Sequence, residues 1–166
     1  MHLKPRRLNS HNDQIYSINN CALPVYDSYK DLGITYDKHL SYTPHVQNIT
    51  VRASQRAKLI LTCFTITRNP DVLMKTFIVY VRPMLEFSST VWNHMTKQNI
   101  RKVQSVQKRL TKRLVGLSKI SYNRRLEMLN IESLEERRLR ADLIMCYKIL
   151  RGFVNLDRYI FCASRK

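Results

Sequence analysis

The sequence predicts a mainly α-helical fold, a helical bundle preceded by a small antiparallel β hairpin or three-stranded sheet. Glycine and proline are scarce, three and five among 166 residues, which disfavours a fold with many tight turns. Apolar residues recur at helical spacing after residue 41, whereas short alternating stretches typical of strands precede it. The apolar fraction of 44% is sufficient for a core, and the length suits one domain.

The N-terminal part is expected to contain a basic arm and then the strands. Residues 1–12 are polar and basic, and we interpret them as a loose arm. A small β unit is predicted over 13–40, with alternating stretches at 14–19, 22–27 and 30–37. A tight turn is predicted at Asn19-Asn20, because asparagine tolerates positive φ.

A helical bundle is predicted over 41–152. Its first helix begins at Thr43, the expected N-cap before a proline, and runs to about residue 67. A second segment, 71–92, follows the cap Asn69 and should be kinked or split by Pro83, which removes a backbone donor. Apolar residues nearly encircle this segment, so we expect it at the centre of the bundle.

The stretch 96–116 predicts an amphipathic helix, with Thr96 as N-cap and Gly116 as the stop. Its apolar stripe consists of Ile100, Val103, Val106, Leu110 and Leu114. The rest of the surface carries seven cations, Lys97, Arg101, Lys102, Lys108, Arg109, Lys112 and Arg113, with no acid among them. Because such cations repel one another, a bound polyanion would relieve the repulsion.

The last helix is predicted from Ser133 to about Arg151. Ser133 and Glu136 have the spacing of a capping box, and Gly152 is the expected stop. Its buried side is expected to contain Leu139, Leu143, Met145, Cys146, Ile149 and Leu150, and its charged residues near Glu135 to form a solvated surface. Residues 153–166 are interpreted as a truncated tail.

The charge balance indicates a nucleic-acid partner. Lys and Arg number 29 against 12 Asp and Glu, a net charge of +17, and no acid lies between Glu86 and Glu127. Such segregation favours phosphate contacts over a merely solvated basic face. No helix combines a basic face with a large exposed aromatic face, and no segment is apolar enough to span a bilayer, so no membrane partner is expected. The seven cations are the predicted nucleic-acid-binding residues: Lys97, Arg101, Lys108, Lys112 and Arg113 come first, and Lys102 and Arg109 flank them. Arg52, Arg56 and Lys58 are secondary candidates.

No catalytic or metal-binding residues are predicted. The sequence has no P-loop, GxSxG or glycine-rich dinucleotide motif, and its four cysteines lack ligand spacing. We expect the cysteines to be reduced core residues of an intracellular protein, nuclear or cytoplasmic. The aromatic residues Tyr80, Phe87, Trp92, Tyr122 and Tyr147 are expected in the core, and His45 on the surface.

Several motifs resemble one family when they are taken in order. Their segments are Tyr29 to Asp37 (YKDLGITYD), Leu40 to His45 (LSYTPH), Val81 to Phe87 (VRPMLEF), Val91-Trp92, Val106 to Arg113 (VQKRLTKR) and Leu129 to Asp142 (LNIESLEERRLRAD). Across roughly residues 14–152 the sequence resembles the region after the catalytic palm in non-LTR retrotransposon (LINE-type) reverse transcriptases. The resemblance implies a primer-end hairpin and a thumb-like bundle that holds template RNA and primer.

The resemblance also implies that the chemistry lies outside this sequence. The family's catalytic aspartates form an Asp-Asp turn in the palm, and this sequence contains no Asp-Asp. Mg²⁺ would belong to that palm, and no cofactor is expected here. We therefore expect a fragment of an RNA-directed DNA polymerase that binds RNA, DNA or their hybrid and is inactive alone, with a palm-containing polypeptide as a further partner. The alternatives are a basic module for an acidic protein, or a non-functional product of a decayed retrotransposon.

Overall fold

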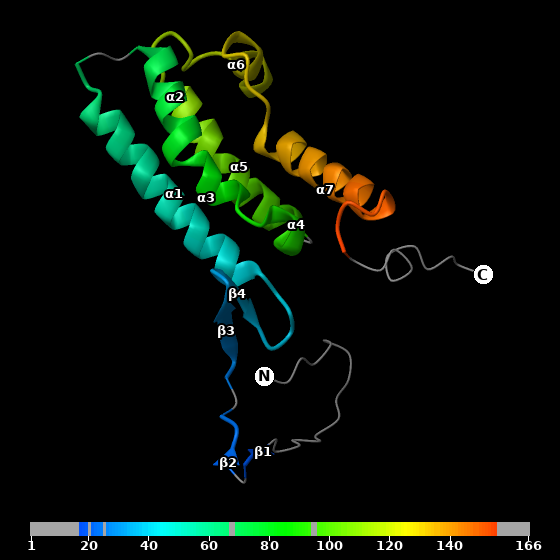
Figure 1. Ribbon diagram of the computed structural model, residues 1–166. Helices are drawn as coiled ribbons and strands as arrows, with labels where there is room; N and C mark the ends of the chain where they lie inside the picture. Colours follow the sequence, from blue (N-terminus) through cyan, green and yellow to red (C-terminus); the bar gives the residue numbers. More distant parts are fainter. Residues whose placement is uncertain (1–16, 20, 25, 67–68, 94–95, 156–166) are drawn as a thin grey trace.

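The protein is mainly helical, with two small antiparallel hairpins that precede the helices. The computed structural model describes residues 17–19, 21–24, 26–66, 69–93 and 96–155. Within these ranges the chain forms four short strands and then seven helices. Figure 1 shows the hairpins at one end of the helical bundle, with the last helix at its outer edge. The predicted arm, 1–12, and the part of the predicted tail from 156 onward lie outside the described residues.

The strands form two separate hairpins instead of one sheet. β1 (Ser17–Ile18) pairs with β2 (Cys21–Ala22), and β3 (Ser28–Asp31) pairs with β4 (Ile34–Asp37). The single strand predicted over 30–37 is wrong, because Leu32 and Gly33 adopt φ values of 45° and 88° and form a turn there. Only the second hairpin reaches the core, through the buried side chain of Ile34.

α1 (Thr43–Cys63) provides one wall of the core. Tyr42 occupies the N-cap position, so Thr43 is the first helical residue and not the predicted cap. The helix also ends at Cys63, before the predicted residue 67. Its buried stripe contains Val46, Ile49, Ala53, Ala57 and Ile60, and it packs side by side with α5 (Lys97–Lys112), as Figure 1 shows.

The predicted central segment is split into α2 (Pro70–Tyr80), α3 (Arg82–Glu86) and α4 (Ser89–Trp92). Asn69 Oδ1 accepts a hydrogen bond from the Asp71 amide at 2.9 Å, which confirms the predicted cap. The break at Pro83 is also as predicted, and Ser88, with a φ of 49°, adds a second break.

This segment is not surrounded by protein on all sides, contrary to the prediction that it lies at the centre of the bundle. Phe77, Val81, Leu85 and Trp92 are fully buried, whereas Val79, Tyr80, Phe87 and Val91 are at least half exposed. α1 packs against α2 and α3, and α7 packs against α3 and α4, but these contacts do not cover the segment on all sides. The predicted burial of Tyr80 and Phe87 is therefore wrong.

α6 (Tyr122–Met128) leads to α7 (Leu134–Leu150), which begins with the predicted capping box. The Ser133 amide donates to Glu136 Oε2 at 2.9 Å, and the Glu136 amide donates to Ser133 Oγ at 3.1 Å. Gly152 follows the helix with a φ of 72°, as expected for its stop.

The predicted buried side of α7 is largely wrong. Leu139, Leu143, Cys146 and Leu150 are exposed, and Ile149 alone of the predicted set is buried. The covered side instead contains Leu134 and Arg138, and α7 packs against α3, α4 and α5. Helical periodicity identified an apolar stripe, but the position of the neighbouring helices placed that stripe outward.

Candidate nucleic-acid interface

α5 has the predicted amphipathic character. Thr96 Oγ1 accepts a hydrogen bond from the Asn99 amide at 3.3 Å, which caps the helix as predicted. Val103, Val106 and Leu110 are at most 2% exposed and face the core. The helix ends at Lys112, before Gly116, although Leu114 beyond its end is still buried.

Gln107 fixes the rotation of α5 about its own axis. Its side chain is 2% exposed, and Nε2 donates to the Glu132 carbonyl at 3.0 Å. Its Oε1 accepts from the Leu134 amide and from the Tyr122 hydroxyl, both at 3.2 Å. Since a buried amide left unpaired is costly, these bonds hold α5 with its cations outward. The sequence analysis missed Gln107; its only signal is a polar residue beside the apolar stripe.

The seven cations, six on α5 and the seventh at its C-cap, Arg113, form two rows. At about 100° per residue, Lys97, Arg101, Lys108 and Lys112 fall within about 60° of one another around the helix. This set is the first row. Lys102, Arg109 and Arg113 fall within about 40° of one another and are the second row; Arg109 and Arg113 border α1. Lys102 is half-buried and the other six are exposed, so both rows are open to solvent.

None of the ten candidate cations forms an ion pair with an acid in the described part of the chain. Lys108 Nζ lies 4.8 Å from the centroid of the Tyr122 ring, a cation–π contact that leaves the positive charge in place. Arg109 Nη2 donates to Ser54 Oγ of α1 at 3.1 Å. No ion pair with an acid of the described residues therefore neutralises these cations.

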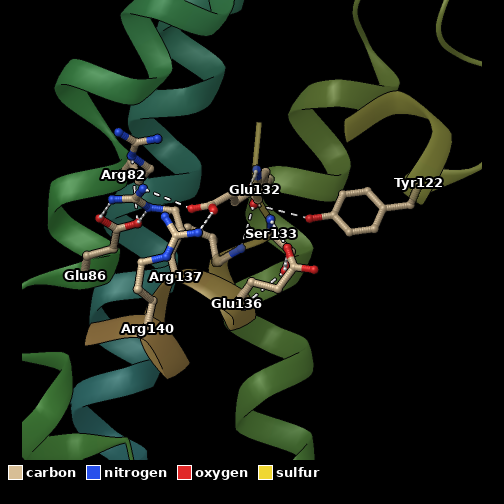
Figure 2. A network of polar contacts seen from close by, with 10 residues as sticks. Arg82, Glu86, Tyr122, Glu132, Ser133, Glu136, Arg137 and Arg140 are labelled. Atoms are coloured by element: carbon tan, nitrogen blue, oxygen red, sulfur yellow. Dashed lines mark hydrogen bonds and ion pairs between the residues drawn. The ribbon is translucent and has the colours of Figure 1, made fainter. Parts of the chain in front are cut away.

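Glu86 of α3 and Glu132, which precedes α7, are paired with arginines of α3 and α7 (Figure 2). Glu86 accepts two hydrogen bonds from Arg137, at 2.5 and 3.1 Å, and lies 3.8 Å from Arg82. The hydrogen bonds that Arg137 donates to Glu86 raise the pKa of Arg137 above its ordinary value. Glu132 pairs with Arg137 and Arg140, so these carboxylates do not neutralise α5.

Arg138 differs from its neighbour Arg137 because it lies in the core. It is 2% exposed, and its Nε and Nη1 atoms have no hydrogen-bond partner. Burial lowers the pKa of Arg138 below its ordinary value. The prediction that the charged residues near Glu135 form a solvated surface is therefore wrong for Arg138.

The three secondary candidates on α1 do not share one surface. Lys58 lines a groove of about 270 Å³ between α1 and α5 together with Arg109 and Arg113. Arg56 Nη1 instead donates to the Tyr80 carbonyl at the end of α2, at 3.4 Å. Arg52 lies one turn from Arg56 and on the same side of α1. The structure thus joins Lys58 to the second row and separates Arg52 and Arg56 from it.

Two side chains near the basic helix were misplaced by the sequence analysis. His45 is buried, not on the surface; its ring centroid lies 5.5 Å from that of Trp92, and Nδ1 accepts from the Thr35 amide at 3.4 Å. Burial lowers the pKa of His45, and the charge of Lys30 lowers it further. Tyr122 is half-buried, and burial raises its pKa to about 12, so it remains a neutral donor to Gln107.

The cysteines and Tyr147 are also more exposed than predicted. Cys21, Cys63 and Cys146 are exposed free thiols, Tyr147 is 54% exposed, and Cys162 lies outside the described residues. In the ranges that the structure describes, no group of three or more His, Cys, Asp or Glu side chains could hold a metal ion. No helix in these ranges is long and apolar enough to cross a membrane.

Comparison with known proteins gives one similarity of note. The chain is 28% identical over 131 residues to the uncharacterized protein B0403.1 of Caenorhabditis elegans. The match covers 77% of this chain and 66% of that protein, so the chain spans just under two thirds of this relative's length. No protein-family model matches the chain. No solved structure matches it.

Proposed function

We propose that this chain is the thumb-like part of a LINE-type reverse transcriptase and that it grips template–primer nucleic acid through backbone phosphates. The observation that carries the proposal is the α5 face, where seven cations lie without an acid partner in the described structure. Phosphate contacts supply most of the affinity of a sequence-independent binder, so little sequence preference is expected.

In this proposal the chain binds the nucleic acid, and a separate polypeptide carries the catalytic residues. This sequence has no Asp-Asp turn, so the carboxylates that hold catalytic Mg²⁺ would belong to a palm-containing polypeptide. The chain itself would position the nucleic acid and contribute charge, whether the partner is RNA, DNA or their hybrid. No catalysis is expected from it alone.

Fluorescence anisotropy with a labelled primer–template duplex tests the proposal. The variant Arg101→Glu/Lys108→Glu/Lys112→Glu should lose most binding, and the salt dependence of log K should become shallower by about 0.9 per lost phosphate contact. Lys75→Glu/Lys148→Glu/Arg151→Glu is the matched control, because it makes the same change in net charge on α2 and at α7. Circular dichroism verifies that both variants are folded.

Two outcomes would contradict the proposal. Equal affinity and salt dependence in the wild type and the α5 variant would show that this face is not the contact surface. A chain that ignores primer–template duplexes at moderate salt, but binds an acidic protein, would support the alternative of a basic module for an acidic partner.

A second candidate function, binding to another protein, is favoured by the exposed stripe on α7. Leu139, Leu143, Tyr147 and Leu150 are each more than half exposed and lie on one side of that helix. A palm-containing polypeptide is the partner implied by the resemblance. Primer extension by a mixture of this chain with such a polypeptide tests this candidate function. The chain should stimulate extension, and Leu143→Glu should abolish that stimulation. Extension that is unaffected by this chain would reject this candidate.

A further inference from the structure

We infer that the groove between α1 and α5 holds one single strand of nucleic acid, with Arg109 anchoring a phosphate. The inference rests on the proposed function and adds the form of the ligand and its place. Figure 1 shows the two helices side by side along their length. Arg109 and Arg113 of the second row line this groove together with Lys58, whereas Arg101 of the first row does not.

The groove has basic sides and an apolar floor. Lys58, Arg109 and Arg113 line it together with Ser54 and Gln55, and its apolar lining consists of Ala57, Leu61, Val106 and Leu110. It adjoins a second hollow of about 500 Å³, which shares Leu61 and Arg113 with it and is lined by Phe64, Leu73, Lys112 and Val115 among others. No acidic side chain lines either hollow.

Arg109 is held in position before any ligand binds. Its Nη2 donates to Ser54 Oγ at 3.1 Å and to Ser105 Oγ at 3.2 Å, and its Nε donates to the Ser105 carbonyl at 3.2 Å. Nη1 has no hydrogen-bond partner among the described residues and remains available to a phosphate oxygen. Because the guanidinium is already ordered, binding costs less side-chain entropy there than at a free lysine.

The apolar floor distinguishes a single strand from a duplex. A duplex presents charged phosphates on its outside and keeps its base faces stacked inside, so it gains little from apolar surface in a groove. A single strand exposes base faces that pack on apolar and aromatic side chains while cations follow its backbone. Phe64, which is partly buried against the core, lines the second hollow and offers such a surface to one base.

A larger cleft of the described structure is unsuited to the same ligand. It measures about 830 Å³ and lies between α5, α6 and the start of α7. Four glutamates line it, Glu127, Glu132, Glu135 and Glu136, with Lys108 as the opposing cation. Phosphates would be repelled there, so charge directs the strand to the smaller α1–α5 groove.

Anisotropy titrations with a short single-stranded oligonucleotide and a duplex of the same length test the inference. The single strand should bind more tightly, and Arg109→Gln should weaken it by about tenfold, the loss expected for one charged hydrogen bond. Arg101→Gln is the matched control from the first row and should weaken it much less. Ser54→Leu keeps every cation but fills the groove, and it should lower single-strand affinity more than duplex affinity.

The outcomes separate this inference from the proposed function. Failure of both nucleic acids to bind would overturn the proposed function and the inference together. Duplex binding with no preference for the single strand, or equal effects of Arg109→Gln and Arg101→Gln, would overturn the inference alone. Circular dichroism confirms that each variant is folded, so a loss of affinity is assigned to the contact.

Discussion

Arg109 of α5 and Ser54 of α1 are joined by a hydrogen bond of 3.1 Å, across a separation of 55 residues in the sequence. The bond ties one cation of the basic face to the neighbouring helix. It makes Arg109 part of a groove with a second wall, whereas Arg101 of the first row lines no part of that groove. The two arginines therefore differ in their surroundings although they carry the same charge.

We expect adjacent arginines of α7 to respond in opposite ways to the same substitution. Arg137→Met removes the partner of the half-buried Glu86 and should lower the free energy of unfolding by about 1–3 kcal/mol. Arg138→Met removes a buried guanidinium whose Nε and Nη1 atoms are unpaired, and should leave stability unchanged or raise it by about 1 kcal/mol. Urea unfolding measures both. A loss of stability in both variants would contradict the account of Arg138.

The capping box of α7 should make a measurable contribution to the free energy of unfolding. Ser133→Ala removes the oxygen that accepts from the Glu136 amide and should cost about 1 kcal/mol in urea unfolding. Ser118→Ala, in the exposed turn after α5, is the control and should change stability by less than about 0.5 kcal/mol. Equal losses in the two variants would argue against the cap.

Acid should weaken the same cap through Glu136. Hydrogen bonds from Ser133 lower the pKa of Glu136, so the unfolded chain binds a proton more readily than the folded chain. This contribution to stability is present above the unfolded pKa, about 4.3, and is lost as the pH falls through the lower folded value. Unfolding measured through that range should show a smaller acid loss in Glu136→Gln, which cannot titrate.

His45 should make stability rise with pH near neutrality. Its pKa is lowered in the folded protein, because burial disfavours the charged ring, and protonation of Nδ1 would also break the bond from the Thr35 amide. The unfolded chain binds the proton more readily, so stability is lost as the pH falls below the unfolded value of about 6.5. Thermal unfolding from neutral to mildly acidic pH measures this slope. An identical slope in His45→Gln would show that another group is responsible.

Leucines on α5 and α7 provide a direct test of the corrected packing. Leu110→Ala removes a side chain that is 1% exposed and should cost about 2–5 kcal/mol. Leu143→Ala removes a side chain that is 61% exposed. The substitution should lower the free energy of unfolding by less than about 1 kcal/mol, because it leaves no buried cavity. A large loss at Leu143 in the isolated chain would show that its side of α7 is covered.

Local signals predicted much of the fold because they depend on neighbours in the sequence. The caps at Asn69 and Ser133 and the break at Pro83 follow from which backbone groups a residue can satisfy or remove. The turn at Gly33 was missed, since an alternating pattern runs through it from Lys30 to Asp37. The amphipathic character of the candidate helix was predicted, but Gln107, which fixes that helix by bonds to distant backbone, had no comparable local signal.

By itself, the sequence determined that α5 is amphipathic, since helical period and residue type place its cations and apolar side chains on different sides. The tertiary structure alone decided which apolar stripes are covered: Val103 and Leu110 face α1 and the core, whereas Leu139 and Leu143 of α7 face outward. It also placed Lys58 beside Arg109 and Arg113 and left Arg56 with α2. The physical reason is that period is a property of one helix, whereas burial and grooves arise between helices distant in the sequence.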